Sequence, residues 1–154
     1  MAETSDFCEL CTSTGGDLLW RNALCRVVYV NDPDYPGFCR VILNRHAAEM
    51  TDLTTDEQQE VMRIVFVVET VVREVIKPDK INLASLGNMV PHVHWHVIPR
   101  WREDRCFPNP IWAPPSRTAA GITAATDPTW ARQLREELEK RLGPSEMIEN
   151  GGQA

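Results

Sequence analysis

The pattern of apolar and polar positions divides this chain into short strand-like runs and longer stretches of helical period. Residues 23–32 and 37–45 are rich in β-branched side chains, which fit the half-buried surface of a strand. The turn-forming stretch NDPDYPG lies between the two runs. The pattern therefore predicts two antiparallel strands joined by a proline-rich connection.

A long helix is predicted after these strands. Apolar residues recur at helical spacing from Val61 to Val75. Thr54 and Glu57 have the spacing of a capping box, and Pro78 marks the stop. Valine favours strands, but the length, the cap and the period of this segment together favour a helix whose apolar face points to the core.

A second helix is predicted near residues 127–142. Asp127 has the position of the N-cap, and Pro128 has the position of the first helical residue. Gly143 follows the last apolar residue of the pattern, so we expect the helix to end there.

Between the two helices, the sequence predicts a strand over residues 81–90 that leads into a turn at Gly87 and Asn88. The stretch HVHWHVIPR then alternates strictly, so three imidazoles share one face of a strand at intervals of about 7 Å. These imidazoles belong to His92, His94 and His96. The other face carries Val93, Trp95 and Val97. Further on, four side chains could cover a pocket or form a dimer surface: Arg100, Trp101, Arg105 and Trp112.

Composition and charge exclude several classes of protein. A chain of 154 residues with 43% hydrophobic and 25% charged residues suits one folded domain with a tail, rather than a disordered chain. Its net charge of -6 provides no basic surface for duplex nucleic acid, so we expect a small-molecule ligand and no nucleic-acid polymer. The first residues lack the pattern of a secretory leader, and no apolar run is long enough to span a bilayer. We therefore expect a cytoplasmic protein with reduced cysteines and no membrane partner.

Three imidazoles on one strand face suit two kinds of chemistry. They could be ligands of a transition metal, or they could act as nucleophile and acid around a phosphate group. A purely structural role is disfavoured, because burying three titratable rings together without partners is costly. Asn88, in the turn before the strand, has an amide that can hydrogen-bond phosphate oxygens.

The segment HVHWHVI resembles the His-x-His-x-His-x-x motif of the histidine triad (HIT) nucleotide-binding proteins. The resemblance covers roughly residues 7–112. It implies an α+β, HIT-like fold with an antiparallel sheet of about five strands, one long helix and a C-terminal helical tail, commonly in a homodimer. We accordingly expect a HIT domain over residues 1–112 and a C-terminal extension over 113–154.

The resemblance also implies an activity and roles for single residues. It implies cleavage at the α-phosphate of a nucleotide through a covalent nucleotidyl-histidine intermediate. His94 would be the nucleophile, and His96 would contact the phosphates and assist the leaving group. His92 would orient His94 or hold a structural metal. Asn31 matches the ribose-binding position best, with Asp32 as the alternative.

A second motif, CELC, has the spacing of half a zinc site at Cys8 and Cys11. Alone, this spacing is equally compatible with a pair of reduced cysteines. The resemblance implies that His46 and His92 complete a closed Cys2His2 set, which would hold a structural zinc ion and leave catalysis without a required cofactor.

Three functional hypotheses remain open at the level of sequence. The leading one is a hydrolase for dinucleoside polyphosphates or nucleoside phosphoramidates. The second is a purine-nucleotide-binding module with little turnover. The third is a metalloenzyme that uses the three histidines as ligands.

Overall fold

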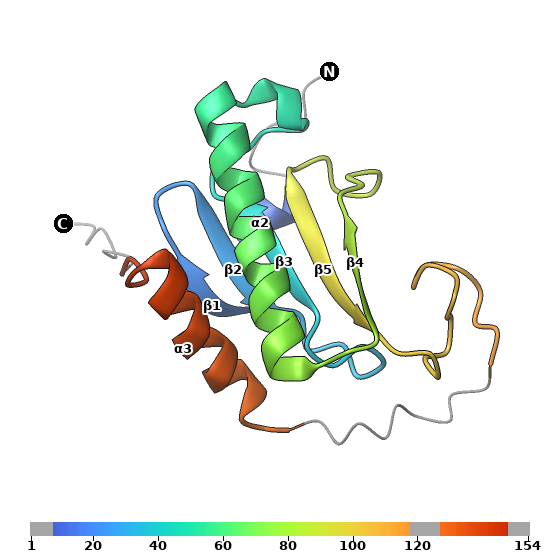
Figure 1. The fold of residues 1–154 in the computed structure, drawn as a ribbon. Helices are drawn as coiled ribbons and strands as arrows, with labels where there is room; N and C mark the ends of the chain where they lie inside the picture. The colour runs from blue at the N-terminus through green and yellow to red at the C-terminus, as the bar shows by residue number, and fades with distance from the viewer. Residues whose placement is uncertain (1–7, 118–126, 148–154) are drawn as a thin grey trace.

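The computed structural model describes residues 8–117 and 127–147, which form a five-stranded antiparallel sheet with two helices over one face (Figure 1). The strand order is β1-β2-β3-β5-β4. The elements are α1 (Glu9–Thr12), β1 (Asp17–Arg21), β2 (Cys25–Tyr29), β3 (Cys39–Leu43), a 3-10 turn (Met50–Asp52), α2 (Thr55–Ile76), β4 (Lys80–Ala84), β5 (His94–Arg100) and α3 (Trp130–Leu142). The predicted α+β fold, with an antiparallel sheet of about five strands and one long helix, is confirmed.

The strands agree with the sequence pattern in pairing but not in every boundary. Strands β2 and β3 pair antiparallel, as predicted, with Cys25 opposite Leu43. Strand β4 ends at Ala84, before the turn that the sequence predicts at Gly87 and Asn88. The chain turns away at Gly87, which has a positive φ of 76° that glycine adopts without strain. Strand β1 was not predicted, because DLLWR is short and does not alternate.

Helix α2 forms as the sequence predicts. The Thr54 hydroxyl accepts a hydrogen bond from the Glu57 amide, and the Glu57 carboxylate accepts one from the Thr54 amide. The helix ends at Ile76, and its C-cap Lys77 is in the left-handed conformation directly before Pro78. Within residues 8–117 and 127–147, no helix has both the length and the apolar composition needed to cross a membrane.

Helix α3 packs against α2 and β1 at one side of the sheet (Figure 1). It begins at Trp130 with Thr129 as its N-cap, so the prediction of an Asp127 cap was wrong. The Asp127 carboxylate instead accepts bonds from the amide and hydroxyl of Thr129, which makes a turn ahead of the helix. Gly143 ends the helix, as predicted, and its carbonyl accepts a bond from the indole of Trp20 at 2.9 Å.

The two faces of the sheet have different environments. Val93, Trp95 and Val97 pack in the core under the helices, as the alternation predicts. His94 and His96 therefore lie on the opposite face, where short helix α1 covers part of the sheet. This division separates the apolar core from the polar side chains of the site.

A buried ion pair anchors the loop after β5. Arg100 is 1% exposed and Asp104 is 0% exposed, and the guanidinium makes two bonds to the carboxylate, of 2.6 and 3.0 Å. Arg100 also donates to Asn82 and to the carbonyl of Asn109, while the Asp104 carboxylate accepts from the Phe107 amide. These bonds fix the loop that leads to residue 112.

Replacing Asp104 by Asn should destabilise the protein strongly, because it leaves the Arg100 charge buried without its counterion. We expect a loss of about 3–5 kcal/mol in the free energy of unfolding, measured by urea titration. The matched control is Glu60→Gln, which breaks an exposed pair with Arg63 and should cost less than about 1 kcal/mol. Equal effects of the two substitutions would contradict the buried pair as an anchor.

Candidate functional site

His94 has the tautomer of a nucleophile. Its Nδ1 donates a 2.6 Å hydrogen bond to the carbonyl oxygen of His92, so the lone pair of the ring lies on Nε2. Within the described part of the chain, Nε2 makes no hydrogen bond, and His94 borders a cavity of about 490 Å³. Burial lowers the pKa of His94, and the charge of Arg40 lowers it further. The ring is therefore neutral near pH 7 and can attack an electrophile.

His96 lies against His94 on the same face of the sheet. The two ring centroids are 4.8 Å apart, closer than the strand repeat of about 7 Å, because the rings lean toward each other. Nδ1 of His96 is buried and has no hydrogen-bond partner among the described residues. Burial, with smaller effects from His94 and Arg40, lowers the pKa of His96 to about 3. An unpaired buried nitrogen of this kind is costly unless a ligand supplies its partner.

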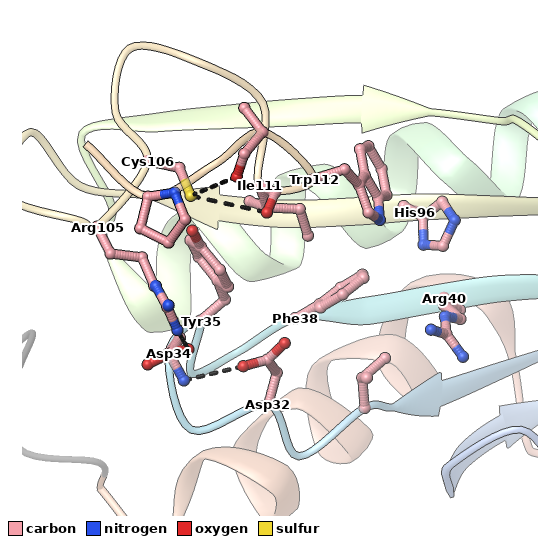
Figure 2. A pocket seen from close by; sticks show the side chains of 13 residues that line it. Asp32, Asp34, Tyr35, Phe38, Arg40, His96, Arg105, Cys106, Ile111 and Trp112 are labelled. Carbon is pink, nitrogen blue, oxygen red and sulfur yellow. Dashed lines mark hydrogen bonds and ion pairs between the residues drawn. The ribbon is translucent and has the colours of Figure 1, made fainter. Parts of the chain in front are cut away.

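A first cavity, of about 390 Å³, opens on the outer side of His96 (Figure 2). Phe38 and Trp112 flank the His96 ring, with centroid distances of 5.6 and 5.2 Å. The far end is polar, where Arg105 contacts Asp34 at 2.5 Å. Aromatic faces beside a polar rim suit a flat heterocycle attached to a polar group.

A second cavity lies on the His94 side and is bounded by the turn before β5. Asn88 borders it, as do Leu86 and Met89, which are 53% and 94% exposed. Both cavities are lined by Arg40, His96 and Trp112. The two histidines therefore lie where one cavity meets the other, and a ligand long enough to reach both would pass them.

The two candidates for ribose binding lie in different places. Asp32 borders the first cavity, together with His96. Asn31 has a left-handed backbone with φ of 57°, and its amide donates to the Asp17 carboxylate. It borders a separate hollow beside Asp127, which Asp32 borders as well. Of the two, Asp32 is thus the one that also borders a cavity lined by His96.

Several residues that line the first cavity were not identified from the sequence, among them Tyr35, Phe38 and Arg40. A signal for Arg40 was present, because it is a lone charge in the apolar strand segment GFCRVIL and shares the face of Ile42. Of the side chains expected to cover a pocket, Arg105 and Trp112 border the cavity, whereas Arg100 is held in the buried ion pair.

A separate cluster contains Cys8, Cys11, His46 and His92, whose nearest ligand atoms all lie within 4.8 Å of one another. The Sγ atoms of Cys8 and Cys11 lie 3.4 and 3.5 Å from Nδ1 of His92, and Cys11 Sγ lies 3.5 Å from Nδ1 of His46. Tetrahedral zinc bonds of ordinary length would separate a sulfur and a nitrogen ligand by about 3.5 Å. The four residues therefore fit a metal ion, and all five cysteines of the chain are free thiols.

Two further contacts hold the residues of this cluster in position. Nε2 of His92 donates to the carbonyl of Leu43 at 2.8 Å, which leaves Nδ1 unprotonated toward the cysteines. The Arg26 guanidinium donates to the carbonyls of Leu10 and Thr14 at 2.6 and 2.9 Å, which ties α1 to the sheet. The ring of His92 thus belongs to the cluster, while its backbone carbonyl accepts the hydrogen bond from His94.

The HIT domain family profile matches residues 14–103, which include all five strands and the three histidines. The match covers more than half of the chain, and the chain belongs to the HIT domain family.

Curated relatives and solved structures extend this result. The chain is 32% identical over 81 residues to the "AP-4-A phosphorylase" of Mycobacterium tuberculosis, which is 49% of this chain and 42% of that protein. It is 30% identical over 95 residues to the asymmetrical bis(5'-nucleosyl)-tetraphosphatase of Schizosaccharomyces pombe, or 58% of this chain and 52% of that protein. The chain therefore spans about half the length of these relatives. A histidine triad protein from Marinobacter aquaeolei VT8 superposes with a TM-score of 0.69 at 27% identity, covering 87% of this chain and 96% of that one.

His96 should make the stability of the protein depend on pH. The unfolded chain protonates this ring below its usual pKa of about 6.5, whereas the folded protein does so only near 3. The free energy of unfolding should therefore fall as the pH decreases from 6.5 toward 3. By urea titration between pH 7.5 and 5, the native protein should lose up to about 2 kcal/mol more than His96→Asn. Both proteins contain the Cys8 cluster, so its acid sensitivity cancels, and identical pH profiles would contradict the prediction.

Proposed function

We propose that this protein hydrolyses a nucleotide at its α-phosphate, acting on a dinucleoside polyphosphate or a nucleoside phosphoramidate through a nucleotidyl-His94 intermediate. The observation that carries the proposal is the hydrogen bond from His94 Nδ1 to the His92 carbonyl, which leaves Nε2 as a free base beside a cavity. The names of the curated relatives support the choice of dinucleoside polyphosphates.

In the first step, the Nε2 lone pair of His94 attacks the α-phosphorus, and the bond from phosphorus to the leaving group breaks. The hydrogen bond to the His92 carbonyl holds the ring in position and stabilises the positive charge that develops on it. Asn88 and His96 border the same cavity and supply hydrogen bonds for the phosphate oxygens. Asp32 and Phe38 line the first cavity, and in this proposal they hold the nucleoside.

In the second step, water attacks the phosphorus and releases a proton to solvent, the bond to Nε2 breaks, and a nucleoside monophosphate leaves. His94 returns to its neutral form with Nδ1 still donating to the His92 carbonyl. A water molecule can approach from the second cavity after the leaving group has departed, because that cavity borders His94 directly.

The geometry supports this hypothesis over a metalloenzyme that uses all three histidines. Nδ1 of His92 lies 3.4 Å from the Cys8 sulfur, and its Nε2 is bonded to a backbone carbonyl. Both ring nitrogens of His92 are therefore committed away from His94 and His96. A binding module with little turnover is distinguished by experiment.

Replacing His94 by Asn should lower kcat at least about a thousandfold, because the nucleophile is lost while the cavities remain. Nucleotide affinity, measured by isothermal titration calorimetry, should change little. Mass spectrometry of the native protein, quenched within one turnover, should show one nucleotidyl group attached to His94. Rapid turnover without this adduct would contradict the covalent mechanism. A native protein that binds nucleotide without turning it over would favour the binding module.

We further propose that the Cys8 cluster holds a structural zinc ion. Two thiolates and two imidazoles form a closed Cys2His2 set, which has no open position for substrate. The ion would fix the local fold by holding His92 against α1. Through the His92 carbonyl, this constraint would also reach the ring of His94.

Replacing Cys11 by Ala should remove zinc from the purified protein, measured by elemental analysis. It should also lower the free energy of unfolding by about 2.7 kcal/mol, if zinc is a hundredfold above its dissociation constant. Cys25→Ala changes a buried cysteine outside the cluster and should retain the metal. His94→Asn should also retain it. If zinc is lost from His94→Asn but kept in Cys11→Ala, the metal is bound at the histidines of β5 and not at the Cys8 cluster, which contradicts the proposal.

A further inference from the structure

Arg40 occupies the boundary between the two cavities. It lies on β3 directly opposite His96 in the antiparallel register. Its side chain borders both the first and the second cavity, and in Figure 2 it lies below His96, at the end of the first cavity away from Arg105. A ligand that extends from one cavity into the other therefore passes this guanidinium.

Arg40 forms no direct ion pair in the described part of the chain, and burial lowers its pKa, although the more distant charges of Glu9 and Asp32 act to raise it. Its Nε is buried and has no hydrogen-bond partner, and the contact from Nη1 to the Gly15 carbonyl is long, at 3.5 Å. No ion pair within 4.0 Å involves Arg40 among residues 8–117 and 127–147. The guanidinium does lie 5.6 Å from the centre of the Phe38 ring. An arginine is always charged, so an unpaired buried nitrogen on its guanidinium calls for an anion.

Two neighbouring arginines show how different this arrangement is. Arg105, at the far end of the first cavity, is paired with Asp34. Arg26, on the same face of the sheet, donates to several backbone carbonyls and has a structural role. Neither has a buried nitrogen without a partner. Of these three arginines, Arg40 is thus the one with a buried nitrogen that has no hydrogen-bond partner.

We propose that Arg40 binds the phosphate chain of the substrate between the two cavities and thereby selects a polyphosphate over a phosphoramidate. This inference rests on the proposed hydrolysis at His94 and specifies its substrate class. A polyphosphate chain carries several negative charges beyond the α-phosphate, whereas the amine of a phosphoramidate carries none.

The chemistry of the leaving group supports the same choice. When Nε2 of His94 bonds to the α-phosphorus, the bond from phosphorus to the bridging oxygen breaks, and its electron pair stays on the departing phosphate. That phosphate leaves as an anion, and the Arg40 charge stabilises it without any proton transfer. An amine must be protonated to leave. His96 is neutral in the ligand-free protein, so it has no extra proton to give until substrate raises its pKa.

The test compares two substrates with the same nucleoside, a dinucleoside tetraphosphate and a nucleoside 5'-phosphoramidate. Arg40→Met should lower kcat/KM at least about tenfold for the tetraphosphate and less than about threefold for the phosphoramidate. Arg40→Lys keeps the charge but loses the planar guanidinium, so its kcat/KM for the tetraphosphate should lie between those of Arg40→Met and the native protein. The control Arg73→Met removes the same charge from the exposed side of α2. It should leave the ratio of the two kcat/KM values, tetraphosphate to phosphoramidate, unchanged. Equal losses on the two substrates would overturn the proposal.

A binding measurement separates this proposal from the proposed function. Inorganic tripolyphosphate should bind the native protein and Arg73→Met in isothermal titration calorimetry, and Arg40→Met should bind it at least about tenfold more weakly. Undiminished binding by Arg40→Met overturns the role of Arg40, even if the protein is a hydrolase. Weakened binding together with no turnover of either substrate by the native protein supports Arg40 and overturns hydrolysis. Circular dichroism checks the fold of each variant, and Arg40→Gln replaces Arg40→Met if that variant is unfolded.

Discussion

The site depends on one hydrogen bond, from Nδ1 of His94 to the carbonyl oxygen of His92. This bond fixes the tautomer of His94, and without it the lone pair could reside on either nitrogen. The carbonyl is itself held in place, because the His92 ring is buried between the Cys8 sulfur and the Leu43 carbonyl. A backbone group therefore has the role that a carboxylate side chain has in many catalytic histidine pairs.

The sheet keeps the chemistry apart from the packing. Strand β5 has Trp95 and Val97 under α2, where burial stabilises the fold, and His94 and His96 on the other face. Because alternate residues serve the two faces, the core can be well packed without constraining the polarity of the site. The loop fixed by Arg100 and Asp104 then brings Trp112 to the edge of the His96 ring.

Local patterns predicted the elements better than they predicted the site. The capping box at Thr54 and the alternation around His94 depend on neighbours in sequence, and both agree with the structure. The role of Arg40 depends on its register opposite His96, which no single segment contains. The start of α3 was misplaced because the Asp127 side chain makes a turn with Thr129 as readily as it caps a helix. The set of Cys8, Cys11, His46 and His92 came from the family resemblance and not from a local pattern, because Cys8 and His92 lie 84 positions apart.

Helix α1 has a consequence for how this chain reaches its native state. Glu9–Thr12 is a single helical turn, too short to persist by itself in water. Its order comes from partners such as His92, which lies 84 positions from Cys8. The entropy lost in closing so long a loop grows only with the logarithm of its length, but the first contact must still bear it. The N-terminal turn is therefore a product of long-range assembly, and part of its structure comes from a contact with the segment just before β5.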